Sequence, residues 1–167
     1  MPEHVKEKQF ETDVVESLVS QGGYAIGANQ FHDVALGLDA SELFSFFGAT
    51  QIENWNELIV RHGGDADEAQ IKFKQRLASE LDKRGTLDVL RRGVEDQGLP
   101  FQLAYFRPAH AKNPELVEAY GKNRLTVTRQ LRYSAAHGHS VDLCLSVKGL
   151  PVATAELKHH LNGQTVD

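Results

Sequence analysis

Cysteine is nearly missing from this sequence, since Cys144 is the only one among its 167 residues. A single thiol cannot close a disulfide within the chain, which excludes the small secreted folds that depend on disulfide bonds. It also leaves the eight histidines without the cysteine partners of most structural zinc sites. We therefore expect a fold stabilised by its hydrophobic core in a reducing, cytoplasmic environment.

Long apolar runs are missing as well. No stretch approaches the roughly 18 residues that a membrane-spanning helix needs. No basic start is followed by the apolar stretch of a secretory signal. We therefore expect no membrane-spanning helix, no secretory signal and no membrane partner. With 41% hydrophobic and 25% charged residues, the chain has the composition of one globular domain.

Basic residues are scarce in the first 100 positions, which hold 10 lysines and arginines against 18 aspartates and glutamates. Positions 101–167 reverse this ratio, with 8 basic and 5 acidic residues. A basic C-terminal part is a weak indication of contact with a polyanion, although an ordinary solvated surface can have the same composition.

Apolar spacing changes along the chain from helical to alternating. It predicts helices over 10–19, 43–47, 51–62, 65–84 and 86–92, and a helical turn before Tyr120. Asp39 is expected to cap the second helix, and Gly85 to end the fourth. Alternation predicts strands over 101–106, 125–133, 141–147 and 152–158. The expected class is therefore α/β (α+β), with a helical first half followed by a mainly antiparallel sheet.

The last hairpin brings two carboxylates together in one of its two registers. A three-residue turn over 148–150 makes Asp142 face Glu156, with Lys158 on the same side. Six apolar residues then share the opposite face: Val141, Leu143, Leu145, Ala153, Ala155 and Leu157. A two-residue turn would shift the register and mix the two faces, so the pattern favours the longer turn.

Facing carboxylates repel each other, and a bound divalent cation removes that repulsion. Their hard oxygens suit Mg²⁺, which can polarise a phosphodiester and lower the pKa of a bound water. Lys158 could orient the attacking water and offset developing negative charge. The spacing alone is not specific, because a cross-strand salt bridge on a solvated face would use the same residues.

Several segments closely resemble the N-terminal domain of type I restriction enzyme endonuclease (R, or motor) subunits. They comprise residues 123–130, 141–158 and 161–165, with 90–93, 101, 105–108, 50, 51 and 55 upstream. The resemblance covers nearly the whole chain. It implies a restriction-endonuclease-like core, in which a mixed β-sheet is flanked by helices.

The resemblance also assigns roles to single residues. Asp142, Glu156 and Lys158 match the family's Asp…Glu-x-Lys nuclease residues. Asp142 and Glu156 would bind Mg²⁺, with the Leu157 carbonyl as a further ligand, and Lys158 would assist the attacking water. Glu11 falls where related nucleases often place an acidic residue on the first helix.

Basic residues flank these positions: Arg124, Arg129, Arg132 and Lys148. Arg129, Arg132 and Gln130 are candidate DNA contacts, although an ordinary solvated strand face explains them about as well. The sequence departs from the family after Lys158, where His159 replaces the usual asparagine and His160 follows. This pair could alter DNA contact or the response to pH.

No Gly-x-x-x-x-Gly-Lys-Ser/Thr loop occurs in the sequence, whereas family members continue into an ATP-driven translocase. We therefore expect residues 1–167 to form one nuclease domain of a much larger chain, with ATP bound only by the full-length subunit.

These observations predict a Mg²⁺-dependent endonuclease domain of a type I restriction-modification system. It would hydrolyse double-stranded DNA without sequence specificity, after translocation by the motor. The implied partners are the modification (methyltransferase) and specificity subunits. We expect weak or no activity from the isolated domain. Two alternatives stay open: a non-catalytic docking module of the motor subunit, and a repair or recombination nuclease of the same fold.

Overall fold

The structure is a computed structural model that describes residues 3–110, 112–134 and 137–157. Its helices lie where the apolar spacing predicts them. They are α1 (Glu3–Ser20), α2 (Ala40–Thr50), α3 (Ile52–Arg61), α4 (Ala66–Arg84), α5 (Thr86–Arg92) and α6 (Pro114–Gly121), with a 3₁₀ turn, η1 (Asn29–Phe31). Among the described residues, no helix combines the length and the apolar character that crossing a membrane requires.

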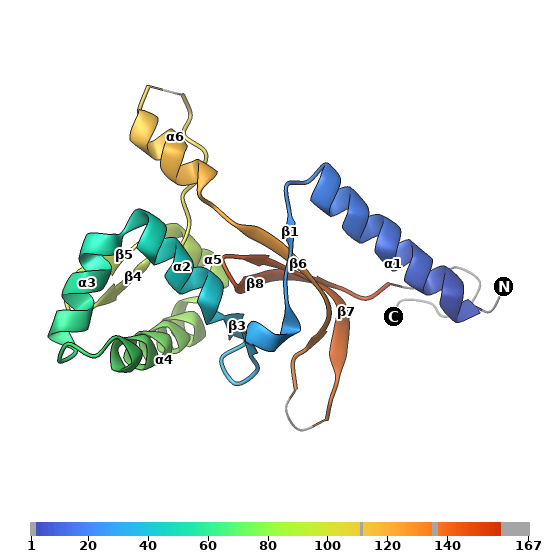
Figure 1. Cartoon of the computed structure of the whole chain (residues 1–167), viewed down its shortest axis with the longest axis horizontal. Coiled ribbons are helices and arrows are strands. Elements are labelled where there is room, and N and C mark those ends of the chain that lie inside the picture. Colours follow the sequence, from blue (N-terminus) through green and yellow to red (C-terminus); the bar gives the residue numbers. More distant parts are fainter. Residues whose placement is uncertain (1–2, 111, 135–136, 158–167) are drawn as a thin grey trace.

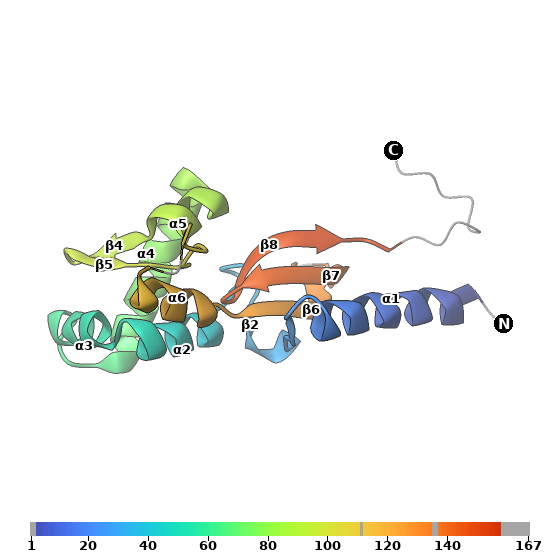
Figure 2. The ribbon, with the colours of Figure 1, turned by 90° about the horizontal axis from the view of Figure 1, so that it is seen from above.

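One mixed sheet connects the two ends of the molecule. Its strands are β1 (Ala25–Ile26), β6 (Leu125–Arg132), β7 (Ser140–Val147) and β8 (Leu150–Ala155), in the order β1-β6-β7-β8. β1 is parallel to β6, and the other neighbours are antiparallel. Helices α2–α5 gather at one end of the sheet, and α1 lies at the other (Figures 1 and 2). This confirms the expected class of a mixed sheet flanked by helices.

Two short hairpins accompany the helical end: β2 (His32–Asp33) with β3 (Leu38–Asp39), and β4 (Val94–Asp96) with β5 (Leu99–Phe101). Aromatic rings form the core there. Phe47, Trp55, Phe73 and Phe101 have ring centroids 5.0–6.3 Å apart in tilted or edge-on pairs, which is the favoured geometry for aromatic contacts. Asp39 caps α2 as predicted, because its carboxylate accepts hydrogen bonds from backbone amides of the first turn.

Helix α1 packs on the sheet through a second, smaller cluster. Val15 contacts Val127 of β6 and Leu143 of β7, and all three are at most 5% exposed. Burial of these apolar side chains fixes the helix against the two central strands. It also holds Glu11, one helical turn before Val15, over the same part of the sheet.

The predicted strand over 101–106 is wrong beyond its first residue. The Gln51 side-chain amide donates to the Gln102 carbonyl at 2.9 Å and accepts from its N–H at 2.8 Å. Asn123 makes the same pair of bonds to Tyr105, at 2.6 and 3.2 Å. These side-chain amides satisfy the backbone polar groups that a neighbouring strand would otherwise pair with. The segment therefore stays out of the sheet.

The predicted three-residue turn between β7 and β8 is also wrong. Lys148 and Gly149 form a two-residue turn with φ of 50° and 81°, and positive values at both central positions match the twist of a hairpin. A bulge follows, in which Val152 is the additional residue. The register beyond it is the predicted one, with Leu143 opposite Ala155.

Candidate active site

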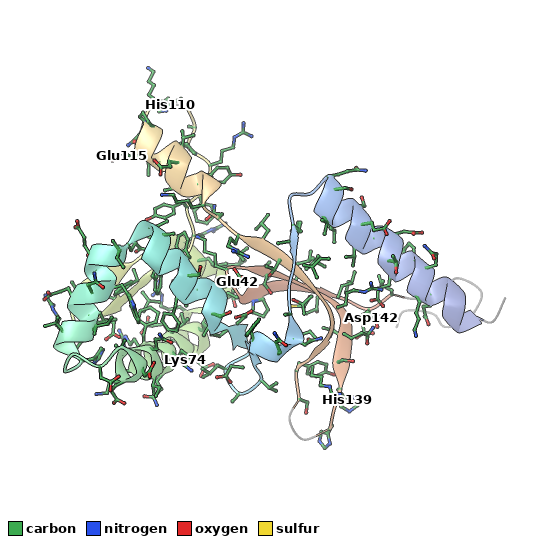
Figure 3. The ribbon with its side chains drawn as sticks, in the orientation of Figure 1. Glu42, Lys74, His110, Glu115, His139 and Asp142 are labelled. Carbon is green, nitrogen blue, oxygen red and sulfur yellow. The ribbon has the colours of Figure 1, made fainter. Side chains whose placement is uncertain are left out.

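A local break in strand alternation orients the candidate acidic residue. Gln130 has φ of 49° and interrupts the β6–β7 ladder opposite Asp142. Beyond this point, Leu131 and Val141 line a cavity together with Cys144, on the face away from α1. Asp142 instead lies toward α1 (Figure 3). Its predicted position on the face opposite the six apolar residues is therefore wrong, because regular alternation does not continue through Gln130.

Two carboxylates share the Gln130 amide nitrogen. Gln130 Nε2 donates to Asp142 Oδ1 at 3.1 Å and to Glu11 Oε2 at 3.3 Å. The second oxygen of each acid has its own donor. Arg129 Nε bonds Glu11 Oε1 at 2.5 Å, and the Leu157 N–H bonds Asp142 Oδ2 at 2.7 Å. The structure thus brings together Glu11, Arg129, Gln130 and Asp142, which the sequence separates by up to 131 positions.

Glu11 is only 8% exposed, so its charge requires compensation. Arg129 supplies it, and a second guanidinium nitrogen donates to Thr12 Oγ1 at 3.1 Å. The guanidinium therefore links β6 to two adjacent residues of α1. Arg129, predicted as a candidate DNA contact, is committed to this internal ion pair.

A cavity of about 620 Å³ opens beside these groups. It is lined by Glu7, Lys8, Glu11, Arg129, Gln130, Asp142 and Leu157. Lys8, one helical turn before Glu11, was not predicted as a site residue, because a lysine on the polar face of a first helix is ordinary. The bridging role of Gln130 was missed as well, although antiparallel pairing of β6 with β7 places it opposite Asp142.

Glu156 follows the end of β8 and is exposed to solvent. Continuing the register from Leu143 and Ala155 by one residue puts Glu156 opposite Asp142. The bond from the Leu157 N–H brings the Glu156–Leu157 peptide to the Asp142 carboxylate. Lys158, with His159 and His160, lies outside the described residues.

The four basic residues predicted as one flank lie in different surroundings. Arg132 is exposed and lines a second cavity, which Gln130 also borders. Arg124 pairs with Glu42 of α2 at 2.7 Å, in the helical end of the molecule. Beside the candidate site, Arg132 is therefore exposed, whereas Arg129 is 40% exposed and paired with Glu11.

Lys148 was predicted in that flank, and this is wrong. Its side chain is fully buried, and Nζ donates to the Leu103 carbonyl at 3.0 Å while lying over the Phe46 ring. Burial lowers the pKa of this ammonium from 10.5 to about 7. The turn geometry decides its place, because the hairpin tip enters the helical core.

The donor set around Gln130 fits a small, hard cation in its chemistry. Carboxylate oxygens of Glu11 and Asp142 point to one nitrogen, and Mg²⁺ prefers one or two carboxylates supplemented by water. Within the described ranges there is no group of three or more acidic, histidine or cysteine side chains suited to a metal.

Residues 4–167 match the family described as type I restriction enzyme R protein N terminus. The match covers nearly the whole chain and confirms the resemblance found in the sequence. No curated protein and no solved structure matches this chain.

Proposed function

The chain belongs to the family of type I restriction enzyme R protein N-terminal domains, and from this membership we propose a Mg²⁺-dependent endonuclease that hydrolyses DNA phosphodiester bonds. The family indicates the N-terminal endonuclease domain of the R subunit and a place in a restriction complex that acts on DNA. The metal dependence, the residues and the subunit contacts are our proposals.

The convergence of Glu11 and Asp142 carries this proposal. One acid comes from α1 and the other from β7, and an oxygen of each lies within 3.3 Å of the same nitrogen. Two carboxylates held this close gain from a positive partner. A domain that served only for docking would have no need for this arrangement beside an open cavity.

In the proposed mechanism, Asp142 and Glu156 would hold the cation, with Glu11 as an accessory carboxylate and the Leu157 carbonyl as a further ligand. A cation bound there would supply Lewis-acid polarisation of the scissile phosphate and a lower pKa for a bound water. Lys158 orients the attacking water and offsets charge that develops on the phosphate. Arg129 fixes Glu11, and the Leu157 N–H fixes Asp142, so both acids are oriented in advance.

The strand that leads into the site is suited to contact DNA. Between Glu118 and Asp142 the sequence has no acidic residue, and Arg132 is an exposed cation there that lies beside the candidate site. His139 lies near the lower end of the β6–β7 hairpin, below Asp142 in this view (Figure 3). With Arg132 exposed beside it, this hairpin would follow the phosphate backbone of a duplex.

Divalent-cation binding and plasmid nicking test the proposal together. We expect Mg²⁺ or Mn²⁺ to raise the melting temperature of the 167-residue chain and to support slow nicking of supercoiled plasmid. Asp142→Asn should lose both effects, whereas the control Asp13→Asn, an exposed acid on α1, should keep them. If the Asp142→Ala variant still nicks plasmid, the assignment of the active site to Asp142 is wrong. The absence of any metal-linked stabilisation would favour the docking module.

A further inference from the structure

The position of Gln130 has a consequence for cation binding that rests on the proposed function. We propose that the Gln130 amide occupies the cation position in the metal-free protein, and that a divalent cation must displace it. Gln130 is then a positioning residue that limits metal affinity.

The pattern of donors supports this assignment. One oxygen of each carboxylate accepts a hydrogen bond from a donor other than Gln130. This donor is Arg129 Nε for Glu11 and the Leu157 N–H for Asp142. The remaining oxygen of each acid faces Gln130 Nε2. An amide N–H₂ carries two donors, so one nitrogen can satisfy two acceptors that would otherwise repel each other.

The contacts of Gln130 lie at the long end of the hydrogen-bond range. They measure 3.1 and 3.3 Å to the two acids, and 3.3 Å from Ser140 Oγ to the amide oxygen. The contacts that orient the acids measure 2.5 and 2.7 Å. Gln130 is also exposed, so its side chain can leave without opening the core. The acids are therefore held firmly, while the amide between them is displaceable.

Electrostatics gives the direction of the effect. A neutral amide offers a partial positive charge to the carboxylates, whereas a divalent cation offers a full charge of two. The carboxylates therefore bind the cation more strongly than the amide, but the amide hydrogen bonds must break first. The apparent affinity for the cation is lowered by that competition, as for any ligand whose binding-competent state is only partly populated.

Replacing the amide should therefore tighten cation binding. We expect Gln130→Gly to bind Mn²⁺ at least about fivefold more tightly by titration calorimetry, the equivalent of about one lost hydrogen bond. Glycine is compatible with the φ of 49° at this position. Gln130→Met keeps the side-chain length but has no amide, and it should bind Mn²⁺ with the same increase in affinity. This variant separates the loss of the amide from the relief of backbone strain that glycine brings.

The chain contains a matched control. Gln97 is also an exposed glutamine with φ of 49°, and it lies in the turn between β4 and β5. Gln97→Gly makes the same chemical change at the same backbone conformation, away from the acids. It should leave the Mn²⁺ affinity unchanged.

The outcomes separate this inference from the proposed function. If Asp142→Asn abolishes Mn²⁺ binding while both Gln130 variants bind as the parent does or more weakly, the inference is overturned and the metal site stands. Weaker binding in particular would make Gln130 a ligand. If Asp142→Asn binds Mn²⁺ as the parent does, the proposed site itself fails.

Discussion

Lys148 places its ammonium 3.0 Å from the carbonyl oxygen of Leu103, inside the helical core and without solvent exposure. The turn of the β7–β8 hairpin therefore lies in the core of the helical end. The open ends of the same two strands lie beside the candidate site. The β7–β8 hairpin thus extends from the helical core to the strand that carries Asp142.

The buried ammonium predicts a pH-dependent stability. The pKa of Lys148 is about 7 in the folded protein and 10.5 in its ordinary state, so the unfolded chain binds more protons between these values. Stability should rise with pH in this window. From pH 7 to 8.5 the free energy of unfolding should increase by about 1–2 kcal/mol through this residue, measured by urea denaturation. Lys148→Met should remove that increase, and an unchanged profile would contradict it.

Gly149 should be intolerant of any side chain. Its φ is 81°, and a Cβ built on it would overlap the backbone carbonyl of Asp39. We expect Gly149→Ala to lower the free energy of unfolding by about 3 kcal/mol, since backbone strain and overpacking add. Gly138→Ala is the control, because its φ is 63° but no atom of the described residues lies within 4 Å of its Cβ. It should cost about 1 kcal/mol, and equal losses would argue against the contact.

The ion pair of Glu11 with Arg129 should attach α1 to the sheet. Arg129→Ala leaves a carboxylate that is 8% exposed without its guanidinium, so we expect a loss of about 2–4 kcal/mol in stability. Glu11→Gln removes the charge instead and should cost less. A double-mutant cycle by thermal or urea unfolding measures the coupling, and a coupling near zero would mean that α1 is held by Val15 and its neighbours alone.

Arg132 should contribute to DNA affinity without affecting the fold. Its guanidinium is exposed and borders the cavity next to Gln130. Arg132→Ala should weaken duplex binding equally for different sequences and reduce the dependence of log K on log salt by about one unit. Arg92→Ala, at a side chain 76% exposed on α5, is the control and should leave both unchanged. Fluorescence anisotropy at several salt concentrations makes the comparison.

Local patterns predicted most of the elements, because helices and strands reflect the spacing of apolar residues along the chain. The Asp39 cap and the Gly85 stop are local backbone chemistry and were confirmed. The strand over 101–106 failed, because the side-chain amides of Gln51 and Asn123 come from distant positions to satisfy its backbone.

The sequence by itself determined the class of fold through composition and periodicity, and it determined the family and the candidacy of Asp142 through its resemblance to that family. Only the tertiary structure decided that Asp142 turns toward α1, that Glu11 and Gln130 join it, and that Lys148 leaves the site for the core. The physical reason is that two short departures from regular strand geometry, at Gln130 and after Gly149, change which side chains face each other. No spacing of residues along the chain reveals such departures before the elements pack.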